Sequence, residues 1–120
     1  MKNLIAFFQI PALNFDRAVS FYESVFNITL PVSGSEKDKM GFFTQEERYV
    51  GAISFIPDLT PSSNGILIYF DCNDIDVTLS TIKNNGGAIM KDKQAIAGGR
   101  GYFAVFLDSE GNSIGLYSAK

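Results

Sequence analysis

Histidine is absent from this chain of 120 residues, and cysteine occurs only once, as Cys72. Without histidine, the Ser-His-Asp and Cys-His arrangements of nucleophilic enzymes are excluded. A single cysteine excludes an internal disulfide and suits a reducing compartment, so we expect a cytoplasmic protein. Cys72 itself is expected to be a small buried apolar side chain rather than a nucleophile.

Positive charge is also sparse. Ten Lys and Arg residues stand against 13 Asp and Glu residues, which gives a net charge of −3. No basic cluster is present, so we expect no nucleic-acid partner. No apolar run approaches the roughly 20 residues that span a bilayer, and the first residues lack the pattern of a signal peptide, so we expect no membrane association.

The order of predicted elements occurs twice along the chain. At 120 residues, 46% of them hydrophobic, the chain suits one domain of two half-units. A Pro- and Ser-rich segment at 57–65 has no periodicity and forms the expected connector. The sequence therefore predicts one domain over residues 1–120, with modules at about 1–56 and 66–120.

Each half begins with a strand followed by an amphipathic helix. Asn14 is the expected cap of the first helix, which runs to about Phe26, and Asp74 caps the second, which ends near Asn84. The remaining pattern predicts strands at 4–10, 28–32, 40–44 and 49–55, then at 66–72 and 88–91, with a loop at 92–101. A hairpin with its turn at 108–112 closes the chain.

Several motifs together carry a resemblance to a known family. They are the segments 10–18, 21–23, 25–26 and 73–76 and the turn at 108–112. With them, the chain resembles the vicinal oxygen chelate superfamily of glyoxalase, bleomycin-resistance and extradiol dioxygenase proteins. The resemblance implies an α+β fold in which two tandem βαβββ modules form an open, cup-shaped mixed sheet with helices on the outer face. It also implies a small-molecule site in the cup and a homodimer.

Enzymes of that family hold a divalent metal with His and Glu side chains from the first and last strands of each module. The resemblance places Phe7, Gly51, Leu67 and Gly115 at those four positions, and none can bind a metal. A substitute set could draw on Gln9, Tyr69 or Asp71, but one carboxylate makes a poor metal site. We therefore expect no metal and no other cofactor.

Strand alternation predicts which side chains line the cup. The expected lining is rich in aromatic groups and comprises Phe7, Gln9, Phe43, Tyr49, Gly51, Ile53, Phe55, Leu67, Tyr69, Asp71, Phe103, Val105, Gly115 and Tyr117. Arg100, in a glycine-rich loop, is expected to reach over the mouth. Such a lining suits a flat or apolar ligand.

Three functions fit this pattern. The first is a metal-independent protein that binds an apolar or aromatic small molecule. The second is a lyase- or isomerase-type enzyme in which Asp71 is the acid-base group. The third is an interaction module whose aromatic side chains simply fill the cup. The empty ligand positions favour the first.

Overall fold

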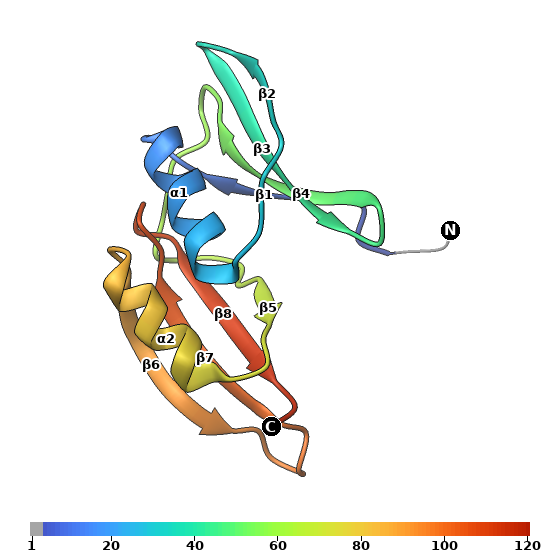
Figure 1. The fold of residues 1–120 in the computed structure, drawn as a ribbon, viewed down its shortest axis with the longest axis vertical. Coiled ribbons are helices and arrows are strands. Elements are labelled where there is room, and N and C mark those ends of the chain that lie inside the picture. The colour runs from blue at the N-terminus through green and yellow to red at the C-terminus, as the bar shows by residue number, and fades with distance from the viewer. Residues whose placement is uncertain (1–3) are drawn as a thin grey trace.

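The computed structural model describes residues 4–120 and divides them into two four-stranded sheets with one helix each. The first half contains β1 (Phe8–Pro11), α1 (Phe15–Phe26), β2 (Val32–Ser35), β3 (Asp38–Gln45) and β4 (Arg48–Phe55). The second contains β5 (Tyr69–Asp71), α2 (Ile75–Asn84), β6 (Ala88–Ala95), β7 (Tyr102–Leu107) and β8 (Ser113–Ser118). Figure 1 shows the two sheets as separate groups of strands.

Both sheets have the same strand order. In the first sheet β1 pairs in parallel with β4, which is followed by β3 and β2, and in the second β5 pairs in parallel with β8, which is followed by β7 and β6. The other neighbouring strands are antiparallel. This mixed arrangement confirms the predicted α+β fold of two βαβββ modules.

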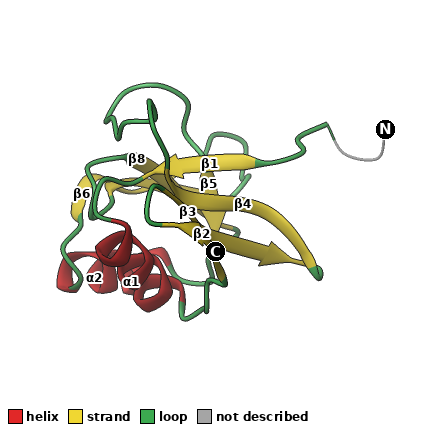
Figure 2. Cartoon of the chain, turned by 90° about the horizontal axis from the view of Figure 1, so that it is seen from above, coloured by secondary structure: helices red, strands yellow, loops and turns green. Residues whose placement is uncertain are grey.

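The helices α1 and α2 lie side by side on one side of the strands (Figure 2). Each sheet therefore has a helix-side face, which packs against α1 or α2, and an open face, which is turned away from both helices. Because side chains alternate along a strand, the contacts of one residue identify the face of its neighbours. Phe106 contacts Phe21 of α1, which places its row of side chains on the helix-side face.

Short polar side chains begin both helices, as predicted. The Asn14 side chain accepts a hydrogen bond from the backbone N–H of Arg17 at 3.1 Å, and Asp74 accepts one from Val77 at 3.2 Å. Each cap accepts a hydrogen bond from a backbone N–H group that has no partner within the helix. This bond stabilises the helix by about 1 kcal/mol. Asn27 ends α1 in the left-handed conformation, with φ of 54°.

Aromatic rings fill the region where α1 meets the two sheets. Tyr22 is fully buried and its ring lies 5.6 Å from Phe43 of the first sheet and 6.0 Å from Phe70 of the second. Phe8 also contacts both of those rings. Burial of each large apolar side chain contributes about 1.5–3 kcal/mol, so this cluster joins the modules strongly.

The turn between β7 and β8 adds a polar link between the halves. The Tyr22 hydroxyl donates to Asp108 Oδ2 at 2.6 Å inside the core. Glu110 accepts hydrogen bonds from the backbone N–H groups of Leu13 and Asn14, at 3.1 and 2.9 Å, and from Arg17 Nε at 2.7 Å. A turn of the second half therefore holds the start of the first helix.

These contacts shift the acid-base properties of the groups involved. Burial raises the pKa of Tyr22 well above its ordinary value, and the charge of Asp108 raises it further. Burial alone would raise the pKa of the Glu110 carboxyl, but hydrogen bonds from Arg17 and the Asn14 backbone bring it below its usual range.

Several predicted boundaries differ from the structure. The first strand begins at Phe8 instead of Leu4, and the second covers 32–35 instead of 28–32. β1 ends at Pro11, one residue after the predicted end at Ile10. Strand β5 is three residues long, whereas β6 continues to Ala95 through a segment predicted as loop. Residues 1–3 of the predicted first module lie outside the described residues, and no helix within 4–120 has the length and apolar character to cross a membrane.

Candidate apolar binding site

The open face of the second sheet carries three aromatic side chains in neighbouring strands. Tyr69 of β5 lies opposite Gly115 of β8, and Tyr117 of β8 lies opposite Phe103 of β7. With Ile96, from the loop after β6, these aromatic residues line a pocket of about 360 Å³. The Tyr69 and Phe103 rings lie 6.5 Å apart at 65°, so they form two walls instead of one flat stack.

A glycine allows the Tyr69 ring to lie against the sheet. A β-carbon added at Gly115 would overlap three atoms of that ring. The missing side chain therefore makes room for the aromatic wall, and Tyr69 still keeps 46% of its surface exposed. The wall is thus available for contact with a ligand.

The loop at 96–101 borders the same pocket. The Tyr117 hydroxyl donates a 2.7 Å hydrogen bond to the carbonyl oxygen of Arg100, which fixes the loop to β8. Gly101 adopts φ of 107°, and a side chain there would collide with the Ser118 carbonyl oxygen. The Arg100 side chain is exposed. The loop therefore brings Ile96 to the pocket, whereas the Arg100 side chain is not among the lining residues.

The open face of the first sheet has a separate aromatic group. The Phe42 and Tyr49 rings stack 4.3 Å apart with an interplanar angle of 6°, and Phe7 lies 6.4 Å from Phe42. Phe7 and Tyr49 are 39% and 49% exposed. Gln9 is exposed in β1 and borders a smaller cavity of about 220 Å³ beneath the connector.

Phe43 and Gly51 do not line the open face, contrary to expectation. Phe43 is buried against Tyr22 and Phe8, and a β-carbon at Gly51 would overlap the Phe8 ring, so both lie on the helix-side face. A β-bulge at Phe43 and Thr44 shifts the register, which puts Tyr49 on the opposite face from Gly51. Simple alternation could not predict this change.

The predictions for Ile53 and Phe55 are corrected for the same reason. Ile53 lies opposite Gly41, whose added β-carbon would contact Val19 of α1, and Ile53 is fully buried on the helix-side face. Phe55 shares this row of alternate residues. By contrast, Val105 lies opposite Gly115 and belongs to the open face.

The strand register also identifies the position in the first module that matches Gly115. Gln9 and Tyr69 each precede the cap of the following helix by five residues, and they pair with Ala52 and Gly115. Ala52, not Gly51, is therefore the counterpart of Gly115. The conclusion about metal binding is unchanged, because an alanine side chain, like a glycine, offers no atom that can coordinate a metal.

The side chains at the four family ligand positions do not fit a metal. Phe7 is an exposed aromatic residue, Leu67 is a half-buried aliphatic residue, and the other two positions are alanine and glycine. Within residues 4–120, no three His, Cys, Asp or Glu side chains come together in a metal-binding cluster. These residues supply no donor set for the divalent ion that the resemblance implies.

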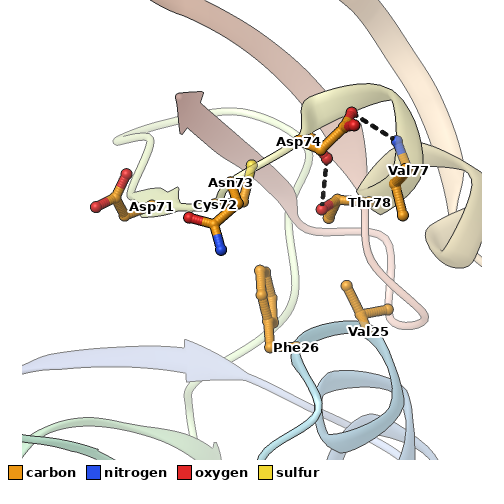
Figure 3. A pocket seen from close by; sticks show the side chains of 8 residues that line it. All are labelled: Val25, Phe26, Asp71, Cys72, Asn73, Asp74, Val77 and Thr78. Atoms are coloured by element: carbon orange, nitrogen blue, oxygen red, sulfur yellow. Dashed lines mark hydrogen bonds between the residues drawn. The ribbon is translucent and has the colours of Figure 1, made fainter. Parts of the chain in front are cut away.

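Asp71 shares the strand row of Tyr69 and lies opposite Tyr117, as alternation predicted, but it does not line the aromatic pocket. It is exposed at the end of β5 and borders a different cavity, of about 360 Å³, between the end of α1 and the start of α2. Figure 3 shows this cavity with Asp71 at one side and Phe26 and Val25 below. Asp71 is therefore not among the residues that line the aromatic pocket, although it lies opposite Tyr117 in the ladder.

The second cavity is built mainly for helix capping. Asp74 accepts from the Val77 backbone, and its carbonyl oxygen accepts from the Thr78 hydroxyl at 3.0 Å (Figure 3). Cys72 is half-buried beside them, and burial raises the pKa of its thiol. The side chains of Asp74 and Thr78 are thus engaged at the start of α2, and the raised pKa favours the protonated thiol of Cys72.

Three residues of the open faces were not anticipated. Ile96 lines the pocket from a loop, Phe42 stacks on Tyr49, and Lys91 lies on the open face opposite Val105. The apolar triplet at 95–97, directly before two glycines, was an available signal for Ile96. Phe42 and Lys91 depend on bulges, for which the sequence offers no comparable signal.

Known proteins share both the sequence pattern and the fold. A "Glyoxylase-like domain-containing protein" of Didymella fabae is 28% identical over 114 residues, covering 88% of this chain and 85% of that protein. The structure of a glyoxalase/bleomycin resistance protein from Albidiferax ferrireducens superposes with a TM-score of 0.73 at 15% identity, covering 97% of this chain and 98% of that one. The fosfomycin resistance protein FosX of Listeria monocytogenes gives 0.71 at 18% identity, with coverage of 98% and 92%.

A family comparison covers nearly the whole chain. Residues 4–116 match the Glyoxalase/Bleomycin resistance protein/Dioxygenase superfamily. This span includes the connector, nearly all of both modules and every residue that lines the pocket of the second sheet except Tyr117. The chain belongs to the Glyoxalase/Bleomycin resistance protein/Dioxygenase superfamily.

Proposed function

We propose that this chain is a metal-independent small-molecule-binding protein that holds a flat, apolar ligand on the open face of its second module. The pocket lined by Tyr69, Ile96, Phe103 and Tyr117 carries the proposal, since its walls are three aromatic rings and one aliphatic side chain. Its volume, about 360 Å³, lies in the range of small-molecule sites. Stacking and burial would supply most of the affinity.

The chemistry of the site supports binding more than catalysis. Asp71 borders the other cavity, and the Tyr117 hydroxyl is engaged by the Arg100 carbonyl. Among the pocket-lining residues, the Tyr69 hydroxyl is the remaining side-chain polar group. No pair of groups there is arranged to donate and accept a proton during a reaction.

A panel of planar aromatic compounds, neutral and charged, tests the site. Binding is measured by ligand-observed NMR, before and after treatment with EDTA, with the metal content determined by mass spectrometry. We expect Tyr69→Ala to weaken binding by about three- to tenfold, which is the loss of one aromatic contact. Tyr49→Ala is the matched control, because that side chain is similarly exposed, at 49%, on the other sheet.

Two results would reject the proposal. Equal losses in the two variants would place the ligand elsewhere or show nonspecific adsorption. Stoichiometric metal in the purified protein, together with loss of binding in EDTA, would show that a metal is required.

We also propose a homodimer. β1 and β5 are edge strands of their sheets, with unpaired backbone groups along one side. Leu4 and Ile5, just before β1, are 81% and 69% exposed. Both features suit a second copy of the chain. Sedimentation equilibrium should give twice the 13.2 kDa mass of one chain, and a monomer at micromolar concentration would reject the dimer.

A further inference from the structure

A positively charged side chain, that of Lys91, lies beside the aromatic pocket, whose own lining residues carry no charge. Lys91 of β6 lies opposite Val105 on the open face. Its Nζ lies 5.7 Å from the centre of the Phe103 ring, which is one wall of the pocket. An ammonium group therefore lies at the side of an apolar site.

We infer that the ligand is a planar aromatic acid, with its ring against Tyr69 and Phe103 and its anionic group toward Lys91. This inference rests on the proposed function and adds the charge of the ligand to it. Three observations support it. Lys91 lies beside the Phe103 ring, it forms no ion pair within residues 4–120, and a bulge in β6 turns Lys91 toward the open face while Lys93 faces the helices.

Lys91 has no carboxylate partner in the described part of the chain. Within residues 4–120 the ion pair formed is that of Arg17 with Glu110, far along the chain from β6. Two carboxylates belong to the same sheet, Asp92 directly after Lys91 in β6 and Asp71 opposite Tyr117, and neither forms an ion pair with Lys91. The amine contacts the Phe103 ring, and its three N–H donors exceed what that contact uses. A ligand carboxylate would complete this environment with charge-assisted hydrogen bonds.

A bulged strand separates two lysines that are two residues apart. Residues two apart normally share a face, but the register of β6 shifts between Lys91 and Gln94. The Lys93 Nζ consequently lies 4.6 Å from the ring centre of Tyr102, a partly buried residue packed against the core. Lys91 thus faces the pocket, whereas Lys93 faces the helix side and provides a matched control.

The charge at the rim also discriminates among ligands. A cationic aromatic compound would be repelled by Lys91 and would compete with it for the Phe103 ring. A neutral compound could stack but would leave the ammonium without a partner. Among the three classes, an aromatic acid is therefore the ligand that the positive charge of Lys91 favours most.

The test compares three probes of one shape: cinnamate, its neutral amide cinnamamide, and the cation cinnamylammonium. Binding to the full chain is followed by NMR titration of the backbone amides of Gly115, which lies beneath the Tyr69 ring, and of Tyr117, which lines the pocket. We expect cinnamate to bind about tenfold more tightly than cinnamamide at low salt, as one charge-assisted contact would give. The preference should shrink as salt is added.

Two variants show whether Lys91 causes the preference for the acid over the amide. Lys91→Gln should reduce the difference between the acid and the amide to about twofold or less, whereas Lys93→Gln should leave it near tenfold. Equal binding of the acid and the amide, or a preference for the cation, would overturn the inference while leaving the proposed pocket intact. A preference that survives in Lys91→Gln would also overturn it. If none of the three probes shifts either amide, the proposed function itself fails.

Discussion

The ring of Tyr69 lies directly over Gly115, its partner in the ladder between β5 and β8. Any β-carbon at position 115 would overlap the ring. The resemblance to metal-dependent relatives places a glutamate ligand at this position. In this chain an aromatic wall occupies the space that such a side chain would need.

Gly115→Ala should therefore displace the Tyr69 ring from the pocket. We expect cinnamate to bind about three- to tenfold more weakly, because one wall of the site is lost. The free energy of unfolding should change by about 1 kcal/mol or less, since Tyr69 is 46% exposed and can rotate. In a Tyr69→Ala background the same substitution should have no further effect on binding. Unchanged affinity in the single variant would show that the ring position does not matter.

Tyr22→Phe should destabilise the protein by about 1–2 kcal/mol, measured by urea unfolding. The substitution removes the buried 2.6 Å hydrogen bond to Asp108 and leaves the ring packing in place. Asp108 Oδ2 would keep its 3.0 Å hydrogen bond from Asn112, which limits the loss. Tyr117→Phe is the control, because its hydroxyl bonds to an exposed loop, and it should cost less than half as much. A similar cost in both variants would contradict a special role for the buried pair.

Glu110 should make the stability of the protein depend on acid pH. Its pKa is lowered in the folded state, so the folded protein binds the proton less readily than the unfolded chain. The stabilisation is therefore complete above the ordinary glutamate pKa, about 4.3, and is lost as the pH falls through the lower folded value. Near neutral pH, Glu110→Gln should cost about 1–3 kcal/mol, because its buried side chain accepts three hydrogen bonds from the start of α1.

The difference between the wild type and Glu110→Gln should narrow as the pH is lowered from about 7 to 3 in urea titrations. Asp16→Asn is a suitable control, since this side chain lies exposed in the first turn of the same helix. A constant difference across the pH range would show that the charge of Glu110 does not contribute.

Cys72 should react slowly with a disulfide reagent in the folded protein. Burial raises the pKa of its thiol, and the thiolate is the reactive form. At about pH 8 we expect a rate at least tenfold below that of the same chain unfolded in urea. Equal rates would mean that the cavity between the helices exposes and activates the thiol.

Local signals in the sequence predicted the helices and the final hairpin. Asn14 and Asp74 cap the helices in the expected way, and Gly111 adopts φ of 88° in the turn. These features depend on a few neighbouring residues, so a single sequence is sufficient to recognise them. The βαβββ order followed from them and is confirmed.

The faces of the strands were harder to predict because alternation fails at a bulge. Tyr69, Phe103 and Tyr117 were placed on one face, where the structure has them, since β5, β7 and β8 pair regularly. Phe43 and Gly51 were placed on the wrong face, because β3 and β4 change register between them and Tyr49. Lys91 was missed for the same reason in β6.

The hydrogen bonds from the turn at 108–112 to α1 determine whether the two modules could fold as separate fragments. The carboxylates of Asp108 and Glu110 belong to the second half, but each accepts hydrogen bonds from donors of the first half, Tyr22 for Asp108 and the start of α1 for Glu110. Separated fragments would each carry part of this network without its complement, and burying such groups unpaired is costly. Although the two modules share one strand order, each therefore depends on hydrogen-bonding groups of the other. Each completes the other, and a split version of the chain would recover its structure only when both pieces associate.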